Sequence, residues 1–452
     1  MYTEILAQRA AENRPVRVGI VGAGKFGSGL VAQIAQMRGM VTAVIADINV
    51  ARAQQVFAAC GVPVEQQQVA QNLNELNDAI GQGKFAVVED ALLVTQADGI
   101  DVVAEVTGIP EIGARIAYEA ITNRKHVVMV NVEADVAVGA ILRRLADAAG
   151  VVYTLVDGDQ PGCIMNMIDW AKSLGFEIVA AGRGTVFYGD DRNGTPDSVP
   201  QRFGLDPEML AKRPINLKMY NSFRDGTKAQ VEMAALSNMC GLPPDVRGMH
   251  EPSVNIEEIP RLFSLREEGG LLNRSGVVEL ANSVAADGKT MLSNPLKMGV
   301  FVVMRSEHPF IQEDLTIYHK MPVGGNGKNF LLWRPYHLVA VEAPISIAMA
   351  ACMGRATGSP LPTPTAEVIT VAKNNLEEGE VLDGGGGYTV NGICERADIA
   401  RNERLLPLGL ASGAKLKCEV AQGQAITYDM VELPTDSFIY KLRQLQDATV
   451  WR

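Results

Sequence analysis

The chain has 452 residues, and 47% of them are hydrophobic, which is enough for several packed cores. Its formal net charge of −11 argues against nucleic acid and anionic membranes as partners. The 6 cysteines are scattered without metal-type spacing, and no apolar run is long enough to cross a bilayer, so we expect reduced thiols in a cytoplasmic protein.

The first expected strand, 16–21, runs directly into a glycine-rich turn that is followed by an apolar helix. In the spacing Gly-x-Gly-x-x-Gly, Gly22 allows a tight turn, Gly24 lets the backbone approach a pyrophosphate, and Gly27 lets helix and strand pack closely. The pyrophosphate would bind the N–H groups at the helix start. This context predicts a nicotinamide dinucleotide site. Its predicted cofactor-binding residues are Gly22, Gly24, Lys25, Phe26 and Gly27.

The second expected strand, 41–46, ends at Asp47. A carboxylate at this position usually accepts hydrogen bonds from the adenosine ribose and repels a 2′-phosphate, so Asp47 by itself favours NAD. Arg52 follows five residues later and is able to reach a 2′-phosphate instead. Both cofactors therefore stay open on the residues alone.

Further along, strands are expected at 102–106, 126–130 and 151–156, with helices between them. Strands that alternate with helices predict a parallel, doubly wound sheet of the Rossmann type. The polar stretch 64–99 reads as an insertion between the two halves of this fold.

Polar residues follow the ends of these strands, where open α/β sheets place their ligands. Thr107 and Gly108 are expected to line the nicotinamide side. Glu133 is a candidate catalytic acid or a helix cap. Asp159 is a candidate substrate-site acid; with Asp157 it could hold a divalent cation, or both could serve as cap and turn residues.

After residue 157 the strand–helix alternation is lost, which predicts a mixed α+β domain. Helices are expected at 161–174 and 227–239. Lys228 lies at the start of the second helix, where the dipole disfavours a cation, so a catalytic role for it is expected. Asp225 is then its partner or the helix cap.

Later in the chain, glycines and amides accompany three basic residues, which are Lys328, Arg334 and His337. Such groups suit a phosphate or carboxylate of the substrate, although an exposed loop with solvated charges would look the same. A helix expected at 343–353 could return to the first domain. Prolines at 360–364 form a boundary, and 366–434 reads as a small all-β domain with Gly-rich turns.

Three segments resemble one family. The glycine loop, 105–108 and 125–128 resemble homoserine dehydrogenase-like oxidoreductases. The chain is also similar to a narrower group, the SAF-domain homoserine dehydrogenase-like proteins. This group includes 1-deoxy-D-xylulose 5-phosphate reductoisomerase-like enzymes, and the similar segments are 225–234, 334–344, 376–382 and 405–411. The chain departs from the pattern at Asp225 and Lys228, which are three residues apart where homoserine dehydrogenases space the acid and the lysine by four.

The changes in residue pattern predict three domains: a Rossmann domain at 1–156, a catalytic α+β domain at 157–358 and a β domain at 359–452, which the resemblance implies is SAF-like. The resemblance also implies NADP(H), with Mg²⁺ or Mn²⁺ as a further cofactor, and the conversion of 1-deoxy-D-xylulose 5-phosphate to 2-C-methyl-D-erythritol 4-phosphate. In this reading the catalytic residues are Lys228, Asp225, Glu133 and Asp159, and Lys328, Arg334 and His337 bind the phosphate.

Two other hypotheses remain. One is a dehydrogenase of the same type that acts on another small hydroxy acid or polyol phosphate without rearrangement. The other is a dinucleotide-sensing or carbohydrate-binding module, against which the acids and the lysine after the strand ends argue. A homo-oligomer is expected in each case.

Overall fold

The computed structural model describes residues 2–206, 208 and 215–451, which divide into two compact units. Unit 1 comprises Met1–Gly162, Leu338–Thr363 and Ser437–Arg452. Unit 2 comprises Cys163–His337 and Pro364–Asp436. Across the described residues, no helix combines the length and the apolar character that a membrane span requires.

A parallel sheet of seven strands forms the centre of unit 1, in the order β3-β4-β2-β1-β5-β6-β7. The inner strands are nearly continuous runs of valine, isoleucine and alanine because helices cover both faces of such a sheet. The predicted Rossmann-type class is thereby confirmed. The strands are β1 (Val16–Val21), β2 (Met40–Ala46), β3 (Gln67–Val69), β4 (Phe85–Val88), β5 (Val102–Glu105), β6 (His126–Met129) and β7 (Tyr153–Leu155).

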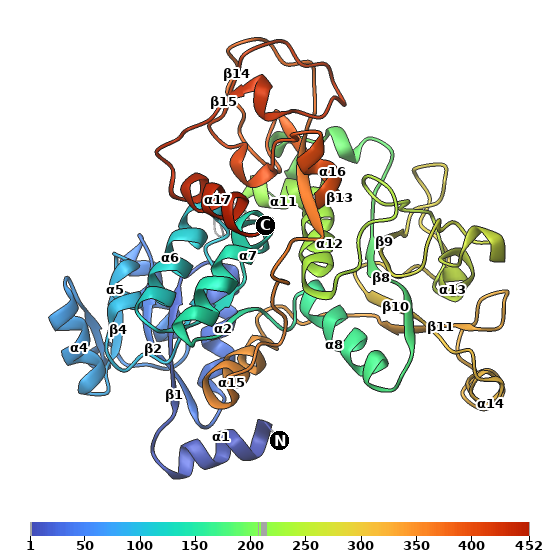
Figure 1. The fold of residues 1–452 in the computed structure, drawn as a ribbon. Helices are drawn as coiled ribbons and strands as arrows, with labels where there is room; N and C mark the ends of the chain where they lie inside the picture. Colours follow the sequence, from blue (N-terminus) through green and yellow to red (C-terminus); the bar gives the residue numbers. More distant parts are fainter. Residues whose placement is uncertain (1, 207, 209–214, 452) are drawn as a thin grey trace. The chain divides into compact units, whose positions relative to one another are not determined.

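The helices of unit 1 come from all three of its segments. They are α1 (Tyr2–Ala11), α2 (Lys25–Ala35), α3 (Val50–Ala59), α4 (Leu73–Gly81), α5 (Leu92–Gln96), α6 (Pro110–Thr122), α7 (Val132–Ala149), α15 (Ala343–Met353) and α17 (Phe438–Thr449). Figure 1 shows α6, α7 and α17 side by side, and α15 shares the apolar core with β1 and α2. The carboxylate of Glu111 accepts the backbone N–H groups of Phe438 and Ile439 at 2.7 and 2.9 Å, which anchors the start of α17.

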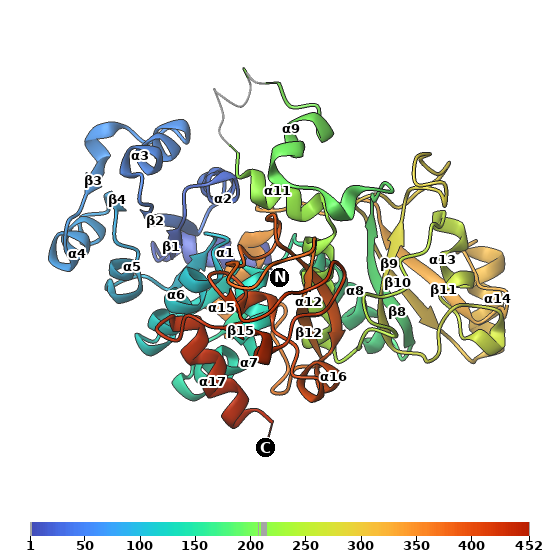
Figure 2. The same cartoon turned by 90° about the horizontal axis from the view of Figure 1, so that it is seen from above.

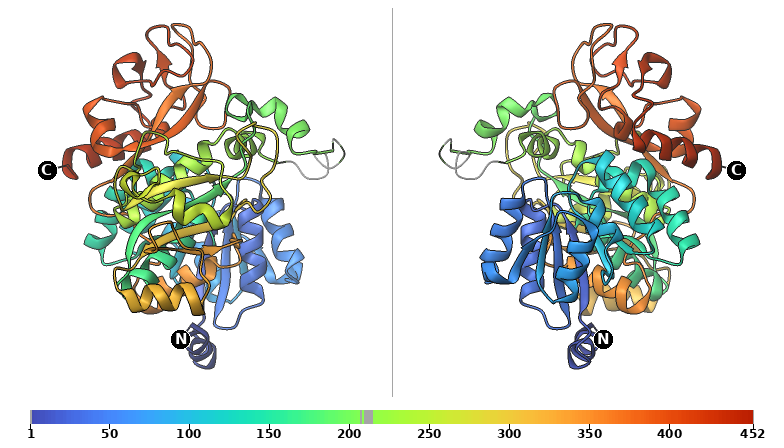
Figure 3. Two further views of the ribbon diagram at one scale, coloured as in Figure 1. Left: turned by 90° about the vertical axis from the view of Figure 1, so that its right-hand side faces the viewer. Right: turned by 90° about the vertical axis from the view of Figure 1, so that its left-hand side faces the viewer.

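The sequence predicted an insertion at 64–99, and this prediction is wrong. The stretch contributes β3 and β4, which extend the sheet beyond β2, with α4 packed against β4 (Figure 2). The right-hand view of Figure 3 shows these blue elements facing the viewer. Short strands of three and four residues leave little local pattern, so the pairing of β4 with β2 and of β3 with β4 decides this assignment.

Unit 2 contains a second sheet of four strands in the order β11-β10-β8-β9, in which only β8 and β9 run parallel. Its strands are β8 (Glu177–Thr185), β9 (Val277–Asn282), β10 (Val300–Arg305) and β11 (Asn329–Arg334). Its helices are α8 (Gln160–Ser173), which carries the chain over from unit 1, α9 (Val199–Arg202), α11 (Leu217–Arg224), α12 (Thr227–Cys240), α13 (Ile259–Leu262), α14 (Pro309–Glu313) and α16 (Ala397–Asn402). The α12 helix is buried along almost its whole length because it packs on β9 and on the tail.

The tail of unit 2 holds two short antiparallel pairs, β12 (Ala366–Ala372) with β13 (Val390–Arg396) and β14 (Lys415–Leu416) with β15 (Val431–Glu432). Both β12 and β13 pack against α12, as Figure 2 shows for β12 and Figure 1 for β13. Residues 364–436 therefore cluster with 163–337, whereas 437–452 belong to unit 1. The division into three domains stays a prediction.

Candidate functional site

The glycine loop of unit 1 has the backbone geometry that phosphate binding requires. Gly22 has a φ of 115°, and a Cβ at Gly27 would lie 2.0 Å from the carbonyl oxygen of Gly22, so neither position tolerates a side chain. A Cβ at Gly24 would meet nothing within 4 Å. Gly24 is also the N-cap of α2, and no side chain caps that helix start. The residues present thus fit a pyrophosphate at the positive end of α2.

Asp47 ties the end of β2 to this loop. Its Oδ2 accepts the Ala23 N–H at 2.7 Å, and its Oδ1 accepts the Asn49 N–H at 2.8 Å. Nη2 of Arg52 donates to both oxygens, at 2.7 and 2.8 Å, while the Arg52 side chain stays 47% exposed. These four contacts occupy about four lone-pair positions, which is the capacity of a carboxylate. A ribose hydroxyl would therefore have to replace Arg52.

A buried carboxyl lies at the end of β5, and it is a residue that the sequence reasoning did not select. Glu105 accepts the N–H of Thr107 at 2.8 Å as well as its hydroxyl. Gly108 has a φ of 68°, so the turn after Thr107 depends on glycine. Burial raises the pKa of Glu105 to about 7. Thr107 and Gly108 thus form a tight turn at the predicted edge of the sheet.

A second buried acid lies on the first turn of α7. The hydroxyl of Tyr153 donates to Oδ1 of Asp135 at 2.9 Å, and no described residue hydrogen-bonds to Oδ2. Burial raises the pKa of Asp135 to about 7, and burial together with Asp135 raises the pKa of Tyr153. Glu105 also raises the pKa of Tyr153, so the three groups interact electrostatically. Unit 1 thus contains two buried carboxyls whose pKa values are raised to about 7.

The predicted acids Glu133 and Asp159 follow β6 and β7, which are neighbouring strands. Glu133 is half-buried in the first turn of α7, but the cap of that helix is Asn131, whose side chain accepts the Ala134 N–H at 3.2 Å. Asp159 is buried, and its Oδ1 accepts the Gln160 N–H at 3.0 Å. Among the described residues, no group of three histidines, cysteines or acids is arranged to hold a metal ion. A divalent cation stays a prediction.

In unit 2, Lys228 is the second residue of α12 and is 9% exposed. Asp225 was expected either to pair with it or to cap its helix. The N-cap of α12 is Gly226, and Oδ1 of Asp225 accepts the N–H of Thr227, the first residue of the helix, at 3.0 Å. The ion-pair partner of Asp225 is Lys373, whose Nζ lies 2.8 Å from Oδ2, and both side chains are fully buried. Asp225 is therefore occupied by a structural contact.

Lys373 also donates to two backbone carbonyls, those of Gly194 at 2.9 Å and Gly387 at 2.8 Å. All three donors of its ammonium group are thus satisfied. Burial raises the pKa of Asp225, and the Lys373 charge opposes that effect. Further along α12, Glu232 forms a buried ion pair with Arg183 of β8. These contacts hold the helix that carries Lys228.

The three predicted substrate-binding residues lie on β11 or next to it, and each has a different contact. Lys328 precedes β11 and contacts Glu307 at 2.6 Å, whereas Arg334 ends the same strand. The six residues of β11 separate the backbone positions of Lys328 and Arg334 by roughly 20 Å. His337 contacts the carbonyl oxygen of Met298 at 3.1 Å. A phosphate site shared by these residues therefore stays a prediction.

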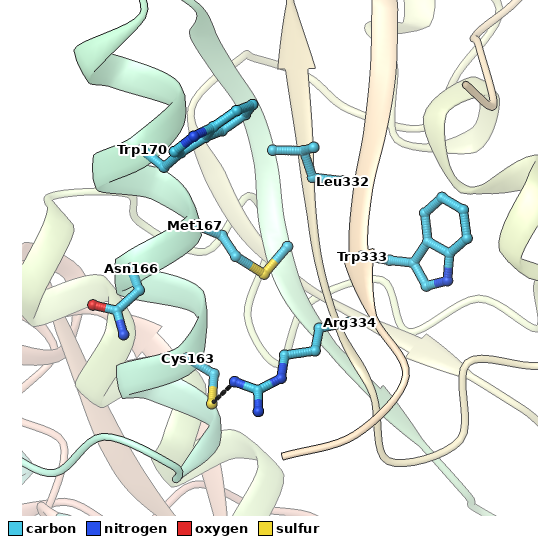
Figure 4. Close-up of a pocket in the computed structure, with 7 residues that line it drawn as sticks. All are labelled: Cys163, Asn166, Met167, Trp170, Leu332, Trp333 and Arg334. Carbon is cyan, nitrogen blue, oxygen red and sulfur yellow. Dashed lines mark hydrogen bonds between the residues drawn. The ribbon is translucent and has the colours of Figure 1, made fainter. Parts of the chain in front are cut away.

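Arg334 instead lines a groove of about 350 Å³ between α8 and β11, which we call the α8–β11 groove. Its Nη1 lies 3.5 Å from the sulfur of Cys163, and its guanidinium lies over the Tyr336 ring at 4.7 Å from the centroid. Figure 4 shows the lining residues, which are Cys163, Asn166, Met167, Trp170, Leu332, Trp333 and Arg334.

Unit 2 also holds a histidine–carboxylate pair that the sequence did not predict. Nδ1 of His250 lies 2.6 Å from Oε1 of the fully buried Glu279, which raises the pKa of the histidine. The flanking residues Met249 and Glu251 have φ values of 66° and 47°, which is unusual for side chains of this size. The hydrogen bond to Glu279 helps to hold this turn in place.

Comparisons with known proteins identify similarity to oxidoreductases. Residues 158–343 match the family model described as oxidoreductase DRL, catalytic domain. A homoserine dehydrogenase from Methylobacillus glycogenes is 26% identical over 172 residues, which is 36% of this chain and 38% of that relative. The matched stretch thus spans well under half of the relative's length. These matches support the predicted class, an oxidoreductase that uses a nicotinamide cofactor.

Solved structures give only a distant similarity. A protein described as a probable dehydrogenase from Thermotoga maritima has a TM-score of 0.40 and 11% identity, with coverage of 75% of this chain and 90% of that chain. An NAD binding oxidoreductase from Klebsiella pneumoniae has a TM-score of 0.28 and 18% identity, with coverage of 40% and 45%. Similarity at this level says nothing about substrate or assembly.

Proposed function

We propose that the protein is a nicotinamide-dependent dehydrogenase of the homoserine dehydrogenase-like type that acts on a small hydroxy acid or polyol phosphate. The observation that carries this proposal is the glycine loop of unit 1. There, the open space beside Gly24 adjoins the start of α2, which no side chain caps. When bound, the dinucleotide supplies the hydride donor or acceptor.

Dehydrogenation without rearrangement is better supported than the reductoisomerase reaction that the resemblance implied. The family model is described as an oxidoreductase and the relative as a homoserine dehydrogenase. Neither description names an isomerisation.

Lys228 is the residue we propose to stabilise developing negative charge on the substrate oxygen. The ammonium group of Lys228 is positively charged and the start of α12 carries a partial positive charge. Both charges stabilise an oxyanion. Glu133 and Asp159, which follow adjacent strands, are the proposed proton acceptors from the substrate hydroxyl. Asp225 is a positioning residue in this scheme because its carboxylate is engaged with Lys373 and the start of α12.

We propose NADP(H) as the preferred cofactor. The exposed Arg52 is able to turn from Asp47 to a 2′-phosphate, and Asp47 would keep its two backbone donors, Ala23 and Asn49. NAD(H) would instead require the ribose hydroxyls to displace Arg52 without a new partner for its charge. A divalent cation and a homo-oligomer remain part of the proposal, to be tested separately.

The first experiment is the titration of the purified protein with NADPH and with NADH, followed by the fluorescence of the reduced cofactor. Gly24→Glu should abolish binding because a carboxylate would then occupy the proposed phosphate space. Gly81→Glu is the matched control, since Gly81 is exposed in the same unit and also has no neighbour within 4 Å of a Cβ. If neither cofactor binds to the unmodified protein, the proposal is refuted.

The second experiment measures turnover with each cofactor. Homoserine and other small hydroxy acids, polyol phosphates and 1-deoxy-D-xylulose 5-phosphate serve as substrates, with and without Mg²⁺. Lys228→Met should lower kcat by about 100-fold or more while cofactor affinity is retained. Substrate-dependent formation of the methylerythritol phosphate would restore the reductoisomerase reading. Unchanged kcat in Lys228→Met would remove this lysine from the mechanism.

A further inference from the structure

The α8–β11 groove is built from two element faces with matching periodicity. On α8, Cys163, Met167 and Trp170 recur at intervals of four and three residues, so they lie along one face of the helix. On β11, Leu332 and Arg334 are two residues apart and point to the same side of the strand. Figure 4 shows both pointing toward α8, whereas Trp333 points away from it.

The two ends of this groove differ in chemistry. At one end, Trp170, Met167 and Leu332 present an indole ring, a thioether and a branched apolar side chain. Trp170 is 50% exposed, so much of its ring surface is available to a ligand. At the other end, Arg334 adds a permanent positive charge next to Cys163 and Asn166. Seven helix residues separate Cys163 from Trp170, which is about 10 Å.

The volume also matches a small molecule. About 350 Å³ lies within the range of roughly 300–1,000 Å³ that ligand pockets occupy, and such pockets combine apolar walls with few polar groups. An arginine at one end favours a carboxylate or another planar anion. The apolar end requires a ring or chain that reaches beyond that anion, which a short, fully polar hydroxy acid lacks.

We propose that the α8–β11 groove is a binding site for an amphipathic organic anion. The carboxylate of the ligand contacts Arg334, and its apolar ring or chain packs against Met167, Leu332 and Trp170. This proposal is separate from the proposed dehydrogenase activity, because the lining residues belong to unit 2 and the dinucleotide loop to unit 1. A binding measurement therefore tests it without any turnover.

The probe is 4-phenylbutyrate, and its neutral amide, 4-phenylbutanamide, is the matched ligand control. The chain has 3 tryptophans, so a protein with Trp333→Phe and Trp451→Phe retains Trp170 as the only indole reporter. We expect a saturable change in Trp170 fluorescence with the acid, and an affinity about tenfold weaker or more with the amide, because the amide lacks the charge. Equal affinities, or no saturable binding of the acid, would overturn the proposal.

The charge requirement is then tested on the protein. Arg334→Met keeps an apolar stem and should weaken binding of the acid about tenfold or more, with little effect on the amide. Arg261→Met, which removes an exposed charge from α13 in the same unit, should leave both affinities unchanged. An unchanged affinity for the acid in Arg334→Met would contradict the proposal. If Trp170 emission instead shifts with protein concentration in the absence of the probe, a second copy covers the groove and the proposal is also overturned.

Discussion

Replacing Lys373 by methionine tests whether the buried ion pair holds unit 2 together. The methionine side chain is similar in length but donates no hydrogen bond, so Asp225 keeps a buried carboxylate without its counter-charge. The carbonyl oxygens of Gly194 and Gly387 lose donors at the same time. Asn221 Nδ2 still donates to the Gly194 oxygen at 2.8 Å, so the variant deprives chiefly the Gly387 oxygen and the Asp225 carboxylate, in a region where water has no access to the Lys373 side chain.

The expected loss of stability is large. Removal of one partner from a buried ion pair costs about 3–5 kcal/mol, and the deprived Gly387 carbonyl adds about 1 kcal/mol or more, although such terms do not add fully. We expect the free energy of unfolding of unit 2 to fall by about 4–5 kcal/mol. A domain is stable by only about 5–15 kcal/mol, so this loss is a substantial share of its stability.

The assay is urea unfolding of proteins that carry Trp451→Phe, followed by the fluorescence of Trp170 and Trp333, which both lie in unit 2. Lys415→Met is the matched control because Lys415 is exposed in the same unit, and we expect a change within about 0.5 kcal/mol. The double variant Lys373→Met with Asp225→Asn should be more stable than Lys373→Met alone, since no buried charge is left. A loss below about 1 kcal/mol in Lys373→Met would refute the reasoning.

Three further outcomes are expected. Because the pKa of Glu105 is raised to about 7 by burial, the folded state keeps its proton longer than the unfolded state, so stability falls as pH rises from about 4.5 to 7. Glu105→Gln should remove up to about 3 kcal/mol of this pH dependence, at about 1.4 kcal/mol per pKa unit. The free energy of unfolding is measured at pH 5 and 8, and a variant that keeps the wild-type difference between them would contradict this expectation. Arg52→Gln should weaken NADPH binding about tenfold and leave NADH binding similar or stronger in the cofactor titration; equal losses for both cofactors would count against a 2′-phosphate contact. Gly27→Ala should lower both cofactor affinity and melting temperature, because its Cβ would lie 2.0 Å from the Gly22 oxygen; a wild-type melting temperature would show that the loop adjusts.

Much of unit 1 could be predicted because its signals are local. The glycine spacing, the apolar strand before it and Asp47 at the end of the next strand lie within about thirty residues, and their backbone roles follow from residue type. The structure places them as expected. The short strands β3 and β4 escaped prediction because the pairing of β4 with β2 and of β3 with β4, and not local pattern, makes them strands.

The sequence by itself therefore determined the parallel sheet, the glycine loop and the acids that follow its strands, since periodicity and turn chemistry act over a few residues. Only the tertiary structure decided what those acids contact. Lys373 lies 148 residues from Asp225, and no spacing rule connects them. Arg334 and Lys328 are close in sequence, but an extended strand holds them apart. Pairing across such separations depends on how the elements pack, which local residue patterns do not encode.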